Sequence, residues 1–230
     1  AGINCFAFLG GISQNYETNL LLGDASDKNA FIVVEADEYD RSFLTLHPYI
    51  ALITSVDADH LDIYGDLNSM HQTYTQFAEQ VQDGGFLIVK KNVDNDLRLK
   101  NKRLIYSLNL DTEYSANSIK IVDGEFCYNI NSPIESVSQV AIGLPGLHNV
   151  ENSIAAVAIA QQLGVKGNVI NNALRSFKGV KRRFDYRLKS KSVVYIDDYA
   201  HHPEELKAAI NAAKQLYPDK KVPGLSLIHI

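Results

Sequence analysis

Two short runs of apolar residues predict buried strands near the start of the chain. One run is Phe31-Ile32-Val33-Val34, and the other covers residues 49–53. Continuous apolar runs, rather than alternating ones, are typical of strands that are covered on both faces of a parallel sheet. Acidic residues follow each run directly, and ligands gather at the carboxyl ends of parallel strands. We therefore expect two acidic clusters side by side at one edge of a sheet.

The middle of the chain alternates between helical and strand patterns. Residues 66–82 place apolar side chains on one helical face, and runs at 86–89 and 103–106 predict further strands. Two alternating segments within 118–130 flank an Asp-Gly pair, which is a strong hairpin signal. The pattern predicts an α/β fold with helices flanking a sheet that is mostly parallel but mixed.

The last third of the chain predicts a boundary between two domains. Helices are expected at 150–163, where Asn149 can serve as the cap, and at about 167–177. A polar and basic link, residues 178–183, follows these helices. We place the domain boundary near residue 184.

A second α/β unit is expected beyond that boundary. Residues 192–196 predict a strand, and Pro203 suits the first position of the helix that follows. Another strand is expected from Lys220, which would complete the start of a βαβ arrangement. Both ends look unlike those of a complete protein, so we expect a truncated chain in which residues 224–230 are a vector-derived tail.

Composition argues against several functional classes. There are 22 basic and 27 acidic residues, and the resulting net charge of −5 gives no nucleic-acid footprint. Cys5 and Cys127 have neither the number nor the spacing of a disulfide framework or a zinc site. No apolar run reaches the length of a membrane span. We expect a cytoplasmic protein that binds small molecules, with no nucleic-acid partner and no membrane insertion.

The two acidic clusters indicate a site for a divalent cation. Their members are Glu35, Asp37, Glu38, Asp57, Asp59 and His60. Carboxylates at the ends of neighbouring strands repel one another unless a cation lies between them. Oxygen ligands suit Mg²⁺, which keeps waters and substrate phosphates in its shell. The alternative is that these residues line a solvated loop, as polar residues commonly do.

Two further clusters lie where helices begin. His148 and Asn152 are four residues apart and can share one side of a helix start, which favours a phosphate or a polar ring. The alternative is that the asparagines of this segment only cap the helix. Residues 197–203 lie between a strand end and a helix start, where active-site loops are found. The alternative there is that His202 caps the helix and His201 is a surface residue.

Five segments, taken together and in order, resemble the motifs of the Mur ligase family. They are residues 35–44, 57–62, 143–152, 180–184 and 197–203. The resemblance implies a P-loop-type central domain followed by the start of a Rossmann-like C-terminal domain. On this basis residues 1–184 are the central ATP-binding domain without its P-loop, and residues 185–223 are the truncated start of the C-terminal ligase domain.

The resemblance also implies an amide-forming ligase of peptidoglycan precursor synthesis. In the family ATP phosphorylates a substrate carboxylate and an amine then displaces the phosphate. Catalysis of this kind consists mostly of positioning and charge stabilisation. The implied cofactors are ATP and Mg²⁺, and the implied small-molecule substrates are UDP-N-acetylmuramate, at its lactyl carboxylate, and L-alanine.

Each implied role falls on a numbered position of this chain. The implied metal contacts are Glu35 and His60. The implied catalytic residues are His60, Arg183 and His201. The implied nucleotide contacts are His148, Asn152, Arg183, Asp198 and Tyr199. Positions on the sugar–lactyl side of the substrate are Asp37, Glu38, Asn15 and Asn19.

Two departures from the family pattern bear on the expected activity and on the branch of the family. The phosphate-binding Gly-x-x-Gly-Lys-Thr loop is missing, so we expect no turnover from these 230 residues alone. No lysine lies between His60 and Lys90, whereas several relatives carry a modified lysine shortly after the metal histidine. The absence of that lysine favours the branch of the family that uses L-alanine.

Three alternatives stay open. A recycling ligase that attaches a ready-made tripeptide to the same sugar nucleotide shares the acidic and Ala-His-His-Pro segments. That ligase tends to have an insertion between the two acidic clusters, where this chain is short. The alternatives from other classes are a non-catalytic nucleotide-binding module and a metal-dependent hydrolase that uses Glu35, Asp59 and His60.

Overall fold

The computed structural model describes residues 2–57, 61–97, 99, 102–109 and 111–224. The strands are β1 (Cys5–Ser13), β2 (Thr18–Leu21), β3 (Phe31–Val34), β4 (Ile50–Ile53), β5 (Phe86–Lys90), β6 (Arg103–Ser107), β7 (Tyr114–Val122), β8 (Glu125–Asn131), β9 (Val137–Ile142), β10 (Asp185–Lys189) and β11 (Val194–Asp197). The helices are α1 (Leu61–Tyr64), α2 (Leu67–Glu79), α3 (Lys91–Leu97), α4 (Leu147–Gln162), α5 (Gly167–Ser176), α6 (Pro203–Leu216) and the 3₁₀ helix η1 (Ser42–Thr45).

The largest sheet has six strands in the order β4-β5-β6-β7-β8-β9. Neighbours from β4 to β7 pair in parallel, whereas β8 pairs antiparallel with both β7 and β9. The predicted Asp-Gly hairpin joins β7 to β8. Asp123 and Gly124 both have positive φ angles, of 51° and 82°, as the tight turn requires. The prediction of a mixed, mostly parallel α/β sheet is therefore confirmed.

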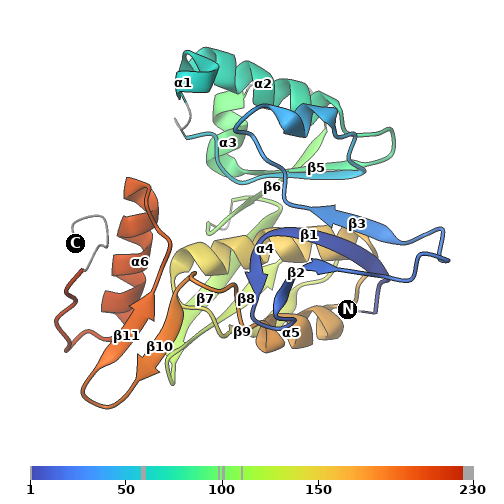
Figure 1. The fold of residues 1–230 in the computed structure, drawn as a ribbon. Helices are drawn as coiled ribbons and strands as arrows, with labels where there is room; N and C mark the ends of the chain where they lie inside the picture. The colour runs from blue at the N-terminus through green and yellow to red at the C-terminus, as the bar shows by residue number, and fades with distance from the viewer. Residues whose placement is uncertain (1, 58–60, 98, 100–101, 110, 225–230) are drawn as a thin grey trace.

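Helices cover both faces of this sheet and create two hydrophobic cores (Figure 1). α2 and α3 pack on one face, and α4, with α5 beside it, packs on the other. Strand β5 divides its side chains between the two cores. Leu87 and Val89 belong to the core under α2, and Ile88 belongs to the core under α4. In the described part of the chain, no helix is both long and apolar enough to cross a membrane.

A separate sheet has the order β2-β1-β3 and was only partly predicted. Strand β3 lies where the apolar run predicted it, but it is not buried: Ile32, Val33 and Val34 are 70%, 51% and 46% exposed. Among the described strands β3 pairs only with β1, and β4 pairs only with β5. The prediction was therefore wrong for the burial of β3 and for the pairing of β3 with β4. It was correct for the burial of β4, where Ala51 and Ile53 are 2% and 3% exposed.

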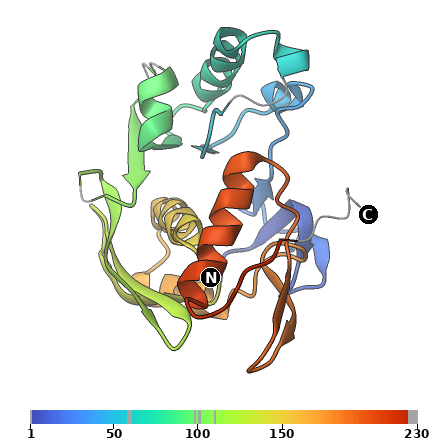
Figure 2. The same cartoon turned by 90° about the vertical axis from the view of Figure 1, so that its left-hand side faces the viewer.

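The part of the chain after residue 184 forms a two-stranded antiparallel sheet, β10-β11, followed by α6. Figure 2 shows α6 beside α4, and Phe184 packs in a small core with Ala212 and Ala213 of α6. The strand expected from Lys220 does not form within the described residues. The Lys220 ammonium donates instead to the carbonyls of Lys191 and Ser192. Of the expected βαβ arrangement, the first strand and the helix form as β11 and α6, and the second strand does not form at residues 220–224.

Two helix starts differ in how they are capped. α4 begins three residues earlier than predicted, after Gly146, whose φ of 100° few side chains tolerate. Asn149 is therefore not the cap predicted from the sequence, and its amide donates to the Pro145 carbonyl at 2.7 Å. α6 begins after His202 with Pro203 at its first position, as predicted.

Candidate functional site

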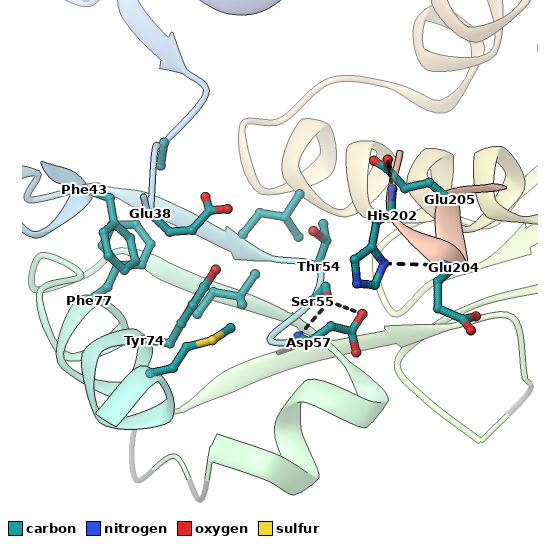
Figure 3. Close-up of a pocket in the computed structure, with 14 residues that line it drawn as sticks. Glu38, Phe43, Thr54, Ser55, Asp57, Tyr74, Phe77, His202, Glu204 and Glu205 are labelled. Atoms are coloured by element: carbon teal, nitrogen blue, oxygen red, sulfur yellow. Dashed lines mark hydrogen bonds between the residues drawn. The ribbon is translucent and has the colours of Figure 1, made fainter. Parts of the chain in front are cut away.

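A cavity of about 370 Å³ opens between the edge of the large sheet and the first turn of α6 (Figure 3). On the side of α2 its wall is apolar, because Phe43, Tyr74 and Phe77 stack there as an aromatic cluster. Polar side chains face them, among them Asp57 after β4 and His202 before α6. A concave surface that is partly apolar and carries a few polar groups is typical of small-molecule sites.

The polar groups after β4 belong to the second acidic cluster. The Ser55 hydroxyl donates to the Asp57 carboxylate at 2.7 Å and accepts the Asp57 N–H at 3.1 Å, which fixes Asp57 at the cavity. Asp59 and His60 lie outside the described residues. The convergence of Glu35 and His60 therefore stays a prediction, although the strands that precede them are not neighbours.

Glu35 follows β3 directly, and a glycine makes room for its side chain. The Gly10 N–H donates to Glu35 Oε2 at 2.7 Å. A Cβ atom on Gly10 would overlap with both carboxylate oxygens, so a larger residue there must displace Glu35. The Glu35 carboxylate is exposed and is an oxygen donor of the kind that suits Mg²⁺. Among the described residues, no three His, Cys, Asp or Glu side chains converge as a metal cluster.

Asp37 and Glu38 lie in the turn that leads from β3 to η1. The Asp37 carboxylate accepts the Tyr39 N–H at 3.0 Å and so shapes the turn. Glu38 lines the cavity, and its carbonyl accepts the Tyr64 hydroxyl at 2.5 Å. Burial and the negative charge of Glu38 raise the pKa of Tyr64, so this phenol remains a donor. Asp37 and Glu38 were both predicted to contact the substrate, and of these two Glu38 lines the cavity.

Charged side chains gather where residues 178–184, the link between α5 and β10, meet the first turn of α6. Arg183 Nη1 donates to Glu205 Oε1 at 3.0 Å. Glu205 Oε2 accepts the backbone N–H groups of His201 and His202 at 3.1 and 3.4 Å. His202 accepts the Glu204 N–H through its ring, so His202 is the helix cap. His201 is 64% exposed at its side chain, which agrees with a surface position.

His148, in the first turn of α4, faces the same boundary. Burial lowers the pKa of His148, while the nearby Asp198 carboxylate opposes this shift and Arg183 adds to it. Asp198 accepts the N–H of Phe184, the neighbour of Arg183, and Phe184 packs on Ala212, which lines one hollow with His148. Three predicted nucleotide contacts therefore lie in one region of the structure. This second hollow lies between α4 and α6, and Asn211 and Lys214 line it too.

Asp198 and Tyr199 hold the loop before α6 against the link. The two oxygens of Asp198 accept the N–H groups of Phe184 and Ala200, each at 2.8 Å. The Tyr199 N–H donates to the Arg182 carbonyl at 2.7 Å, and the Arg182 guanidinium lies 4.9 Å from the centre of the Tyr199 ring. Tyr199 is 53% exposed, and the His201 ring packs edge-on against its ring at 5.2 Å.

Three predicted asparagines stand apart from this cluster. Asn152 is exposed on α4, one turn after His148. Asn15 donates to the Ser176 carbonyl at 2.7 Å and accepts the Lys178 N–H at 2.8 Å, so it ties the β1–β2 turn to the segment after α5. Asn19 is exposed on β2. Neither Asn15 nor Asn19 lines the cavity, and a sugar contact by Asn15 would compete with its two backbone bonds.

Gly10 and Glu205 were missed as site residues by the sequence analysis. Glu205 received no role in the sequence analysis. Its spacing from His202 is that of a capping box, which was the available signal. Gly10 carries no local signal, because its contact with Glu35 joins strands that are 25 residues apart in sequence.

The comparisons with known proteins agree with this architecture. Residues 6–160 match the Mur ligase middle domain, and residues 182–225 match the family described as Mur ligase, glutamate ligase domain. The chain belongs to the Mur ligase family.

Two named relatives show which kind of Mur ligase this chain is similar to. The UDP-N-acetylmuramate–L-alanine ligase of Phocaeicola vulgatus is 42% identical over 99% of this chain and 49% of its own length. The enzyme of the same name from Parabacteroides distasonis is 43% identical over 99% of this chain and 49% of its own length. The chain thus spans about half the length of the curated relatives it matches.

The solved structures support the fold. The crystal structure of UDP-N-acetylmuramate-alanine ligase from Thermotoga maritima superposes with a TM-score of 0.80 at 24% sequence identity. The match covers 95% of this chain and 49% of that one. At this identity the likeness establishes the arrangement of helices and strands alone.

Proposed function

We propose that this chain is the ATP-binding core, residues 1–184, and the start of the C-terminal domain of a ligase. The whole protein joins L-alanine to the lactyl carboxylate of UDP-N-acetylmuramate at the expense of ATP, in peptidoglycan precursor synthesis. The observation that carries the proposal is the cluster beside the start of α6. Asp198 accepts the Phe184 N–H, next to Arg183, at 2.8 Å, and Phe184 packs on Ala212, which lines one hollow with His148. Relatives that carry the alanine ligase name at 42–43% identity support the choice of substrate.

The reaction proceeds through an acyl phosphate in this proposal. A lactyl carboxylate oxygen attacks the γ-phosphorus of ATP, and ADP leaves. The amine of L-alanine then attacks the acyl carbon, and inorganic phosphate leaves. Negative charge develops on the transferring phosphoryl group, so preorganised positive groups lower the barrier.

Residues from both sides of the boundary hold the nucleotide in this scheme. His148 and Asn152 at the start of α4 contact the polar ring or a phosphate, as groups at a helix amino end are placed to do. Asp198 and Tyr199 contact the ribose or the base. Arg183 reaches the phosphates, and the exposed His201 lies near them. Burial favours the neutral form of His148, which can both donate and accept a hydrogen bond.

Mg²⁺ is the metal that the donor chemistry fits. The exposed Glu35 carboxylate, held by Gly10, offers a hard oxygen ligand, and His60 is the proposed second contact. When bound, Mg²⁺ neutralises charge on the phosphates during transfer. Glu38, with Asp37, Asn15 and Asn19 as further candidates, falls on the sugar–lactyl side of the substrate.

The test is ADP formation by the full-length protein. We expect ADP only when ATP, UDP-N-acetylmuramate and L-alanine are all present, and no ADP when L-alanine is omitted. ADP formation with the tripeptide but not with L-alanine would make the recycling ligase the better assignment. ATP binding without ADP formation under any of these conditions would favour a non-catalytic nucleotide-binding module. Turnover of the sugar nucleotide that needs metal but no ATP would favour a hydrolase.

A further inference from the structure

Both oxygens of the Glu205 carboxylate accept hydrogen bonds where the link meets α6. One oxygen accepts the Arg183 guanidinium at 3.0 Å, and the other accepts the His201 N–H at 3.1 Å and the His202 N–H at 3.4 Å. Burial raises the pKa of Glu205, but the hydrogen bonds from His201, Arg183 and His202 outweigh it, and the net shift is downward. Glu205 is therefore a carboxylate, and it also lines the cavity in Figure 3.

The backbone around Arg183 is fixed on both sides. Arg182 and Phe184 have positive φ angles of 61° and 46°, a conformation that residues with a side chain rarely adopt. Neighbouring bonds hold them there: the Tyr199 N–H donates to the Arg182 carbonyl, and the Phe184 N–H donates to Asp198. Because the link is held in this way, the direction of the Arg183 side chain depends on what its guanidinium binds.

We propose that Glu205 is a positioning residue for Arg183. In the nucleotide-free protein its carboxylate holds the guanidinium at the boundary, and it releases the guanidinium to the phosphates when the nucleotide binds. This inference rests on the proposed function, in which Arg183 reaches a phosphate. A phosphate and a carboxylate compete for the same planar set of guanidinium N–H donors. The Arg183–Glu205 ion pair therefore keeps Arg183 oriented but also weakens nucleotide binding.

The pair is accessible enough to exchange partners. The side chains of Arg183 and Glu205 are 52% and 35% exposed, and exposed pairs of this kind are weak. Glu205 is anchored independently of Arg183, because the N–H groups of His201 and His202 hold its other oxygen. Loss of the Arg183 contact therefore leaves the carboxylate in place, as an exchange requires.

The chain offers a matched control for this contact. Glu204 is the preceding residue in the same helical turn and lines the same cavity. Its carboxylate pairs with Lys207 at 3.5 Å and is 66% exposed. Glu204→Gln and Glu205→Gln remove the same charge from adjacent positions of one helical turn, so their difference reports the Arg183 contact rather than general repulsion.

The experiment measures binding of a non-hydrolysable ATP analogue with Mg²⁺ to the full-length protein by titration calorimetry. In Glu205→Gln we expect the Kd to fall by about two- to fivefold relative to Glu204→Gln, the size of an exposed ion pair. In an Arg183→Ala background the same substitution should have no such effect. The Gln amide oxygen still accepts the two N–H groups, which preserves the cap. Glu205→Asp, which keeps the charge but is one methylene shorter, should also lower the Kd.

The outcomes separate this inference from the proposed function. If Arg183→Ala weakens binding or lowers kcat while Glu205→Gln behaves like Glu204→Gln, the positioning role of Glu205 is overturned and the proposed function stands. If the Glu205→Gln effect on the Kd persists in the Arg183→Ala background, the effect does not act through Arg183, and the positioning role of Glu205 is likewise overturned. If Arg183→Ala changes neither binding nor kcat, the role of Arg183 fails and that of Glu205 fails with it.

Discussion

Strands β3 and β5 have nearly the same sequence and opposite surroundings. Both begin with a phenylalanine followed by three aliphatic residues, in Phe31–Val34 and in Phe86–Val89. The central residues of β5 are 0–1% exposed, whereas those of β3 are 46–70% exposed. β5 has a parallel partner on each edge and helices over both faces, and β3 has one described partner, β1. An apolar run thus predicts a strand, but its burial depends on residues far away in sequence.

The comparison matters for function because each of these strands leads into the site region. β3 leads directly into Glu35, the proposed metal ligand, and the Gly10 N–H of β1 donates to that side chain. β5 ends at Lys90, whose ammonium pairs at 2.8 Å with Glu151 in the first turns of α4. The α4 side of the site is therefore tied to the well-packed sheet, and the Glu35 side is tied to the exposed one.

The largest expected effect is the difference between two isoleucine truncations. Ile88→Ala in β5 removes a side chain with no exposure and leaves a cavity, so it should lower the free energy of unfolding by about 2–5 kcal/mol. Ile32→Ala in β3 removes a side chain that is 70% exposed and should change it by less than about 0.5 kcal/mol. Urea unfolding of the 230-residue chain measures both. Equal losses would contradict the comparison, because β3 would then have to be covered.

The next effect concerns the support of Glu35. Gly10→Ala should displace the carboxylate with little loss of stability, because the overlapping atoms are the end of a flexible side chain. If Glu35 binds Mg²⁺, the affinity of the full-length protein for Mn²⁺ in the presence of ATP analogue should fall about tenfold, as when a supporting contact is lost. Electron paramagnetic resonance of bound Mn²⁺ measures this. Gly143→Ala, whose new Cβ would make an ordinary 3.5 Å contact, is the control. Equal affinities in both variants would contradict the support role.

A smaller effect is expected where the exposed sheet is tied to the link. Asn15→Ala removes the bonds to the Ser176 carbonyl and the Lys178 N–H and should lower the free energy of unfolding by about 1 kcal/mol. Asn19→Ala, on the neighbouring exposed strand, should change it by less than about 0.5 kcal/mol. A raised KM for UDP-N-acetylmuramate in full-length Asn15→Ala, with stability unchanged, would instead support the substrate contact predicted from the sequence.

The smallest effect is the pH dependence contributed by His148. Its folded pKa lies below the ordinary value of 6.5, chiefly because of burial, so the unfolded chain takes up the proton first as the pH falls. This residue therefore destabilises the fold increasingly as the pH falls from about 6.5 toward the lowered pKa. Urea midpoints at pH 7.5 and pH 5.5 should show a smaller acid-induced loss in His148→Gln than in the unchanged protein. Identical losses would show that the environment of His148 does not favour the neutral ring.

Local signals explain what the sequence predicted correctly. Periodicity located α2 and α5, and the Asp123-Gly124 pair located the β7–β8 turn. The order of the motifs identified the family, because five weak signals in sequence order are together specific. The placement of His202 before Pro203 left its capping role open as an alternative, which the structure confirms.

Long-range pairing explains what the sequence did not predict. β1 pairs in parallel with β3, where Cys5 lies opposite Phe31, and the isolated bridge between Ser13 and Val180 joins residues still farther apart in the chain. The start of α4 was misplaced because Gly146, with its positive φ, takes the position before the helix without any side-chain signal. The contact between Arg183 and Glu205 likewise depends on how α6 packs beside the link.

The central claim is that a nucleotide is held by groups on both sides of the domain boundary during phosphoryl transfer. The most direct measurement is the steady-state rate of L-alanine-dependent ADP formation by full-length Arg183→Ala. Arg187→Ala is the matched control, since Arg187 is similarly exposed but pairs with Asp185 and Asp197 away from the cavity. We predict a fall in kcat on the order of 10²-fold for Arg183→Ala, as for other preorganised charge stabilisers, and a near-normal kcat for Arg187→Ala. A kcat near that of the unchanged protein for Arg183→Ala would contradict the account.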